Sequence, residues 1–285
     1  MEHLYLYKYV PYNEGSLRII TENTLKYTHP SEFNDPFDCA PDIDPAIASD
    51  IVKYSLQSTR GRGGDFTPAK RLMNKRKYAR ALQKKIEDGT LWKEQIDSIG
   101  IVSLTTKPTN LLMWAHYANH HTGFVVEFKI PITAAKQAWA ELYAEHIAQD
   151  AGRHLVAFKV EYTNDRPALK PPLPDPVEPS IRACLTKSLH WSYEQEHRVV
   201  DINRGPGIHP YTPRRLCSVI AGMRMSDDDL SSLENAISIH NGKIHPSDHI
   251  SLFRAEPVNG HFELRVPNHP RADEQNRDNS DDQHD

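Results

Sequence analysis

The chain has 285 residues, of which 38% are hydrophobic and 25% are charged, a composition typical of a globular protein in water. A formal net charge of −4 gives no reason to expect the surface as a whole to attract nucleic acid or membranes. We expect one compact domain over residues 1–266, followed by a disordered, acidic tail over residues 267–285.

Three widely spaced cysteines, Cys39, Cys184 and Cys217, form no CxxC pair. An odd count of isolated cysteines argues against a disulfide framework and a structural zinc site, and it favours a reducing compartment. The N-terminus lacks an apolar signal region, and no window reaches the ~18 apolar residues of a membrane span. The sequence therefore predicts a cytoplasmic protein that does not enter a membrane.

The first part of the chain alternates short strands and helices. Apolar periodicity predicts a strand at 3–10, a helix at 14–23 and a strand at 25–28. A turn follows, in which Asn34, Asp35 and Asp38 either cap their own backbone or hold hydroxyl groups of a ligand. Residues 59–65 are glycine-rich and are predicted to form a flexible link. Their glycines lack the spacing of a phosphate-binding loop, so we do not expect this stretch to bind phosphate.

A helix predicted at 67–87 is strongly basic on its exposed side. Eight lysine and arginine residues lie between Lys70 and Lys85, around an apolar stripe. Such a face is either solvated or contacts the phosphates of a nucleic acid. A solvated face is the more ordinary interpretation, because Tyr78 is the single aromatic residue among the charges.

The strongest secondary-structure signals of the sequence lie at residues 100–128. They predict a half-buried strand at 101–105, a helix at 110–119 and an apolar strand at 124–128. The helix carries Trp114, His116, Tyr117 and His120, whose polar atoms need partners if they are buried. This helix is therefore a candidate wall of a site.

The elements predicted after residue 128 complete the sheet and add further helices. These elements are a helix at 133–151, a strand at 155–162, a proline-rich connector at 164–180, a helix at 181–189 and strands at 193–201, 216–221, 250–254 and 261–266. Ser226 caps a further helix that runs to about residue 240. Together these elements predict an α+β fold in which a mixed, mainly antiparallel sheet is surrounded by helices.

Four segments, at 4–9, 30–38, 112–124 and 191–198, resemble motifs of the bacterial family called domain of unknown function 2971 (DUF2971), in the family's order. The second reads Pro30-Ser-Glu-Phe-Asn-Asp-Pro-Phe-Asp38, and the fourth reads Trp191-Ser-Tyr-Glu-Gln-Glu-His-Arg198. The resemblance runs from about residue 4 to about residue 266. It implies a single domain of that type, and it implies no activity.

Acidic side chains alternate with other residues in the last of these segments. Because side chains at i and i+2 of a strand share a face, Glu194, Glu196 and Arg198 are expected to project together. Neighbouring carboxylates repel each other, and the charge of Arg198 offsets that repulsion. The group is either an ion-pair ladder on a sheet or, with Trp191 and Tyr193 beside it, part of a cleft wall.

The order of elements also resembles ADP-ribosyltransferases of the arginine, serine, glutamate type. That family has a basic residue on its first strand, a Ser-Thr-Ser-like strand that leads into a helix, and a late Glu-x-Glu or Gln-x-Glu strand. Lys8, the strand end at 103–106 and Glu194-Gln-Glu196 occupy these places. Lys8 departs from the family's arginine, whose planar fork can grip a diphosphate with two hydrogen bonds.

This resemblance implies NAD-dependent ADP-ribosyl transfer, in a toxin or an antiviral defence effector. Glu196 would stabilise the oxocarbenium-like ribose as nicotinamide leaves, and Glu194 would orient the acceptor, an unidentified protein or nucleic acid. The residues implied to contact NAD are Lys8, Tyr27, Ser103, Thr105, Trp114, His116, Tyr117 and Arg198.

Two alternatives remain open. His116 and His120 share one face of a helix and, with His197 and a glutamate, could bind a divalent metal in a hydrolase or nuclease, although the His-Glu-x-x-His pattern is absent. A non-catalytic module could instead use Trp114, His116 and the 194–198 strand as a ligand pocket.

Overall fold

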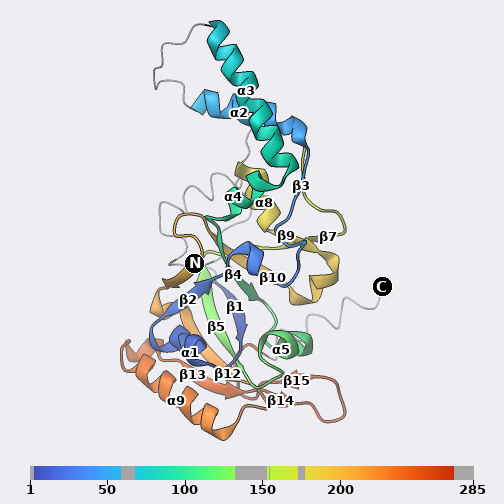
Figure 1. The fold of residues 1–285 in the computed structure, drawn as a ribbon. Helices are drawn as coiled ribbons and strands as arrows, with labels where there is room; N and C mark the ends of the chain where they lie inside the picture. The colour runs from blue at the N-terminus through green and yellow to red at the C-terminus, as the bar shows by residue number, and fades with distance from the viewer. Residues whose placement is uncertain (1–2, 59–67, 132–152, 154, 173–176, 273–285) are drawn as a thin grey trace.

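A computed structural model of the chain describes residues 3–58, 68–131, 153, 155–172 and 177–272. Its centre is a seven-stranded sheet with the order β13-β12-β5-β1-β4-β10-β6 (Figure 1). These strands are β1 His3–Val10, β4 Gly100–Thr105, β5 Phe124–Pro131, β6 Phe158–Lys159, β10 Glu196–Asp201, β12 Leu216–Ala221 and β13 Ser251–Arg254. The pairs are antiparallel apart from β12 with β13, which confirms the predicted α+β fold with a mixed, mainly antiparallel sheet.

Helices and short strand pairs surround this sheet. The helices are α1 Glu14–Thr21, α2 Ala48–Ser58, α3 Pro68–Glu87, α4 Thr90–Ile96, α5 Leu111–Tyr117, α8 Val177–Cys184 and α9 Asp227–Asn241. The short pairs are β2 Thr24–Tyr27 with β11 Gly207–Pro210, β3 Asp42–Ile43 with β8 Ala168–Leu169, β7 Glu161–Thr163 with β9 Thr186–Ser188, and β14 Glu256–Pro257 with β15 Leu264–Arg265. The predicted link at 59–65 and helix at 133–151 lie outside the described residues. In the part of the chain that the structure describes, no helix is both long and apolar enough to cross a membrane.

Strand β5 shows how the sheet acquires two covered faces. Phe124, Val126 and Phe128 are fully buried in one core, which also contains apolar residues of α1 and α9. Val125 points to the other face, because successive side chains of a strand alternate, and it lies in a second core with Trp114 of α5. The apolar run at 124–128 is therefore buried on both faces.

The C-terminal end of the described chain packs against this second face. Ala272 is fully buried, and Arg271 donates from Nε and Nη2 to the two carboxylate oxygens of Glu127 on β5, at 2.6 and 2.7 Å. Tyr7 and Ser218 donate to the same carboxylate. The chain therefore remains packed against the sheet for six residues beyond the predicted domain boundary at 266. Residues 273–285 lie outside the described part.

Helices α2 and α3 form an arm that extends away from the sheet (Figure 1). Its base is a small apolar cluster in which Ile86 of α3 meets Ile47 and Leu169. The predicted basic helix at 67–87 is confirmed as α3.

We predict that Gly123→Ala destabilises the fold. A Cβ at Gly123 would lie 2.2 Å from the carbonyl oxygen of Val10 and 3.0 Å from that of Ala118, so backbone would have to move. The expected loss in the free energy of unfolding is about 1–3 kcal/mol, measured by urea denaturation. Gly242→Ala is the matched control, because the nearest atom to its new Cβ lies at 3.5 Å. Equal stability of the two variants would contradict the prediction.

Candidate functional site

A pocket of about 270 Å³ opens beside the middle of the sheet. Its walls come from β1, β4, β10, α5, β9, and η1 (Pro30–Glu32) with the loop that follows it. The charged residues that line it are Lys8, Glu32, Asp38, Lys187, Glu194, Glu196 and Arg198, and the aromatic ones are Tyr7, Tyr9, Phe33 and Tyr117. Segments that are distant in sequence therefore supply a polar floor and aromatic walls.

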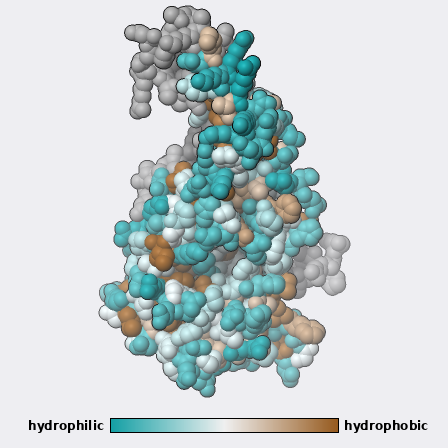
Figure 2. Space-filling model, viewed as in Figure 1, coloured by the Kyte–Doolittle hydropathy of each residue, from teal (hydrophilic) through white to brown (hydrophobic). Residues whose placement is uncertain are grey.

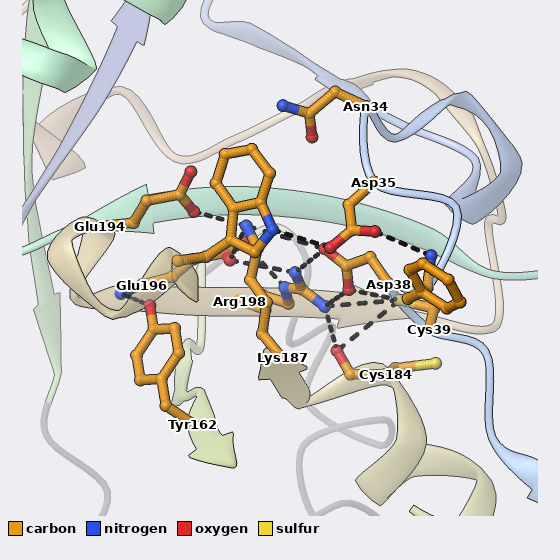
Figure 3. Close-up of polar contacts among 12 residues, drawn as sticks. Asn34, Asp35, Asp38, Cys39, Tyr162, Cys184, Lys187, Glu194, Glu196 and Arg198 are labelled. Atoms are coloured by element: carbon orange, nitrogen blue, oxygen red, sulfur yellow. Dashed lines mark hydrogen bonds and ion pairs between the residues drawn. The ribbon is translucent and has the colours of Figure 1, made fainter. Parts of the chain in front are cut away.

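Arg198 is the centre of the polar floor (Figure 3). Its side chain is fully buried on β10, directly opposite Ser103 of β4. The guanidinium donates to both oxygens of Glu196 at 2.8 and 3.0 Å, to both oxygens of Asp38 at 2.8 and 2.7 Å, and to the carbonyl oxygen of Cys184 at 2.7 Å. These contacts use the five N–H donors of an arginine. Phe33 covers the group, with its ring centroid 5.2 Å from Cζ.

Lys187 is the second buried cation of the floor. Its Nζ donates to Glu194 and, at 3.1 Å, to Glu196, and lies 3.7 Å from a carboxylate oxygen of Asp38. The ring centroid of Trp191 lies 5.1 Å from the ammonium nitrogen. Three carboxylates and two cations thus form one buried network, in which each charge faces an opposite one.

The network fixes the charge state of Glu196. Burial alone would raise the pKa of this carboxyl, but the adjacent charges of Arg198 and Lys187 outweigh burial and lower the pKa to about 2. Burial likewise opposes the charged form of Lys187, yet Glu196 and Glu194 raise its pKa above the usual value. Glu196 is therefore a fixed anion at neutral pH, and Lys187 is a fixed cation.

The strand predicted at 193–201 begins later than expected. Residues Leu189–Glu194 form the 3-10 helix η3, and Gln195 adopts a left-handed conformation with φ 44° before β10 starts at Glu196. Glu196 and Arg198 share a strand face as predicted, whereas Glu194 reaches the same network from η3. The i, i+2 argument was therefore wrong for Glu194, because the backbone turns between the two glutamates.

Tyr117 joins α5 to this floor. Its hydroxyl donates to Glu194 at 2.6 Å and accepts from the side-chain amide of Asn34 at 3.3 Å. Asn110 caps the start of α5 and also donates to the carbonyl oxygen of Tyr193, which ties the helix to η3. The helix is thus held in place at both ends against the acidic segment.

Lys8 lines the pocket from β1, outside the buried network. Its Nζ lies 3.4 Å from the carbonyl oxygen of Ser103. Burial lowers the pKa of Lys8 to about 8, although the negative charge of Glu196 opposes this shift. Lys8 is therefore a cation at the pocket wall that loses its charge at a lower pH than an ordinary lysine.

Six of the ten residues that the resemblance implies to act on NAD meet at this pocket: Lys8, Ser103, Tyr117, Glu194, Glu196 and Arg198. The other four lie elsewhere. Thr105 is buried behind the pocket and donates to the carbonyl oxygen of Glu194, while Trp114 is buried in the core and donates to that of Pro108. Tyr27 is buried on β2, and His116 is exposed on α5.

Lys187 was not singled out from the sequence. It lies where a helix over 181–189 was predicted, but α8 ends at Cys184 and Lys187 is on β9. Asp38 appeared only as a turn residue with two possible roles. The sequence did contain one indication of a second cation. Acidic side chains that are buried together need more than one positive charge beside them.

The helix predicted at 110–119 ends at Tyr117, and His120 follows it with φ 56°. His116 and His120 therefore do not share a helix face, as the metal hypothesis required. His120 is exposed, as is His116, whose ring lies edge-on to that of Tyr117. Among residues 3–58, 68–131, 153, 155–172 and 177–272, no group of three or more His, Cys, Asp or Glu side chains is arranged to hold a metal ion.

Comparison with known proteins supports the family that the motifs suggest. Residues 113–199, which include β9 and parts of α5 and β10, match the family model described as protein of unknown function (DUF2971). No curated protein and no solved structure matches the chain. The match covers the segment that supplies Lys187, Glu194, Glu196 and Arg198 to the pocket.

We predict that Arg198→Met lowers the free energy of unfolding by about 3–5 kcal/mol, because Asp38 and Glu196 would remain buried without their main counter-charge. The measurement is urea denaturation at neutral pH. Arg182→Met is the control, since the Arg182 side chain is 66% exposed and pairs with an exposed carboxylate. A loss no greater than in the control would show that the network does not stabilise the fold.

Proposed function

We propose that the pocket binds NAD and that the protein transfers ADP-ribose from it, with Glu196 as the carboxylate that stabilises the ribose cation. The observation that carries this proposal is the convergence of Glu194, Glu196, Lys8, Ser103 and Tyr117 on one pocket. These residues come from the strand, helix and acidic segments on which the resemblance to ADP-ribosyltransferases rests.

The state of Glu196 suits an electrostatic role. When the bond between ribose and nicotinamide breaks, positive charge develops on the sugar, and a negative charge fixed in advance lowers the energy of that state. A pKa of about 2 keeps Glu196 anionic, whereas a general acid would need a raised pKa. Arg198 holds both carboxylate oxygens, so the group needs no reorientation during the reaction.

The pocket wall suits the rest of the nicotinamide riboside. Tyr9, Phe33 and Tyr117 offer ring surfaces, and Lys8 offers a positive charge for a phosphate. A volume of about 270 Å³ is just below the usual range for ligand pockets, so we propose that the pocket holds the nicotinamide riboside end and leaves the adenosine end outside. Tyr27 and Trp114 lie outside this lining and are not part of the proposed contacts.

Glu194 is assigned to the acceptor. Its carboxylate is held by Tyr117 and Lys187, next to Glu196 but on a different element. A carboxylate in this position can accept a hydrogen bond from an incoming hydroxyl or guanidinium group and direct it toward the ribose.

A second candidate is a ligand-binding module without turnover. It is favoured by the internal pairing of the charges: both oxygens of Glu196 already accept hydrogen bonds from protein cations. In this case the network is a rigid floor, and the pocket recognises a ligand through Lys8 and the aromatic walls. Binding of NAD without release of nicotinamide would identify this second candidate.

We predict that purified protein releases nicotinamide from NAD and that Glu196→Gln reduces the rate by about 10² to 10³. The substitution keeps the shape and deletes the charge. Glu161→Gln is the matched control, because this glutamate is exposed and pairs with Arg182 outside the pocket. The measurement is nicotinamide release with and without cell lysate, with thermal unfolding of each variant alongside. Equal rates for wild type and Glu196→Gln would refute the assignment.

We predict that NAD binding weakens as pH rises from 7 to 9. Because the pKa of Lys8 is lowered to about 8, its charge is present below that pH and is lost above it, together with its attraction for phosphate. Isothermal titration should show this loss for wild type and a flat, weak profile for Lys8→Met. A wild-type profile that matches Lys8→Met would show that Lys8 does not contact the diphosphate.

A further inference from the structure

Helix α3 carries a basic surface that the pocket does not use. Between Lys70 and Lys85 it contains eight lysine and arginine residues, and Glu87 is its single acidic residue, although the whole chain has a net charge of −4. Figure 2 shows hydrophilic residues over the outer part of this arm. Positive charge is therefore concentrated at the part of the molecule that stands farthest from the sheet (Figure 1).

These charges are available for a partner. Arg76, Lys77, Arg80 and Lys84 are exposed, and within the described part of the chain no hydrogen bond or ion pair joins their side chains to other residues. Lys85, by contrast, pairs with Glu94 at 2.7 Å. Arg76, Arg80 and Lys84 follow each other at four-residue spacing, so they form one row along the helix.

The apolar side of α3 is already occupied. Ile86 and Leu82 pack in the cluster at the base of the arm with Ile47 and Leu169. Over residues 73–87, where side chains are described, the helix therefore has no continuous apolar face that could enter a lipid bilayer, although Met73 and Tyr78 are 71% and 62% exposed. The outer surface of the helix can therefore bind a partner mainly through its positive charge. Polyanions are the partners that fit such a surface.

We propose that α3 is a docking surface for double-stranded DNA, which it contacts through the phosphate backbone. An α-helix is about 10–12 Å wide with its side chains, and the major groove of B-form DNA is about 12 Å wide. The corresponding groove of an RNA duplex is deep and narrow, so a helix fits it poorly. A protruding helix with basic side chains along its outer surface matches the geometry and the charge of a DNA duplex.

The experiment measures binding of the full chain to a short labelled DNA duplex by fluorescence anisotropy over a series of salt concentrations. The test variant is Arg76→Gln with Lys77→Gln and Arg80→Gln, all at exposed helical positions. The matched control is Arg18→Gln with Arg182→Gln and Arg265→Gln, which removes the same charge from exposed ion pairs elsewhere. Circular dichroism verifies that both variants are folded.

For wild type and the control, we expect affinity that falls steeply with salt. For the arm variant we expect at least a tenfold loss at low salt and a salt slope smaller by about 2.7, since each lost phosphate contact removes about 0.9 from the slope. Equal losses in the arm variant and the control would overturn the proposal, because net charge would then explain binding. Tighter binding to single strands, to an RNA duplex or to phosphatidylserine vesicles would overturn the assignment of DNA as the partner.

Discussion

The pocket depends on the burial of one guanidinium group. Arg198 has no contact with water, so each of its N–H donors must find an acceptor within the protein. The acceptors come from a loop near the N-terminus, from the end of α8 and from the same strand, and Asp38 lies 160 residues away in sequence. Because arginine donates in a planar fork, these segments have little freedom in how they meet.

A buried network of this kind is weak evidence for stability as such. Its attraction must offset the removal of five charged groups from water, and apolar side chains of the same size often do as well. What the network provides is geometry: a carboxylate whose position and charge are set before any ligand arrives. This preorganisation is common to the two candidate functions, so turnover and binding have to be measured separately.

The central sheet and part of the site could be predicted from the sequence, because their patterns are local. Strands β1, β4, β5 and β12 and the cap of α9 follow from alternation, apolar runs and Ser226. The shared face of Glu196 and Arg198 follows from the period of a strand.

The remaining features depend on contacts that no local pattern encodes. Gln195 separates η3 from β10 through a left-handed conformation that is uncommon for glutamine, and Lys187 enters the network from a three-residue strand. Trp114 has the residue type of a site wall, but the sheet beneath α5 places it in the core. Which partner a buried charge finds is decided by the assembled fold.

The contact between Arg271 and Glu127 makes the central sheet depend on the last part of the described chain. This carboxylate is fully buried on a central strand, and its bidentate partner Arg271 lies 144 residues later in the chain. Until that residue arrives, the middle of the sheet holds a negative charge without its main counter-charge. A contact between residues so far apart in sequence closes a large loop, and chain entropy opposes the closure of such a loop. The stability of a central strand therefore depends on a residue near the end of the described chain.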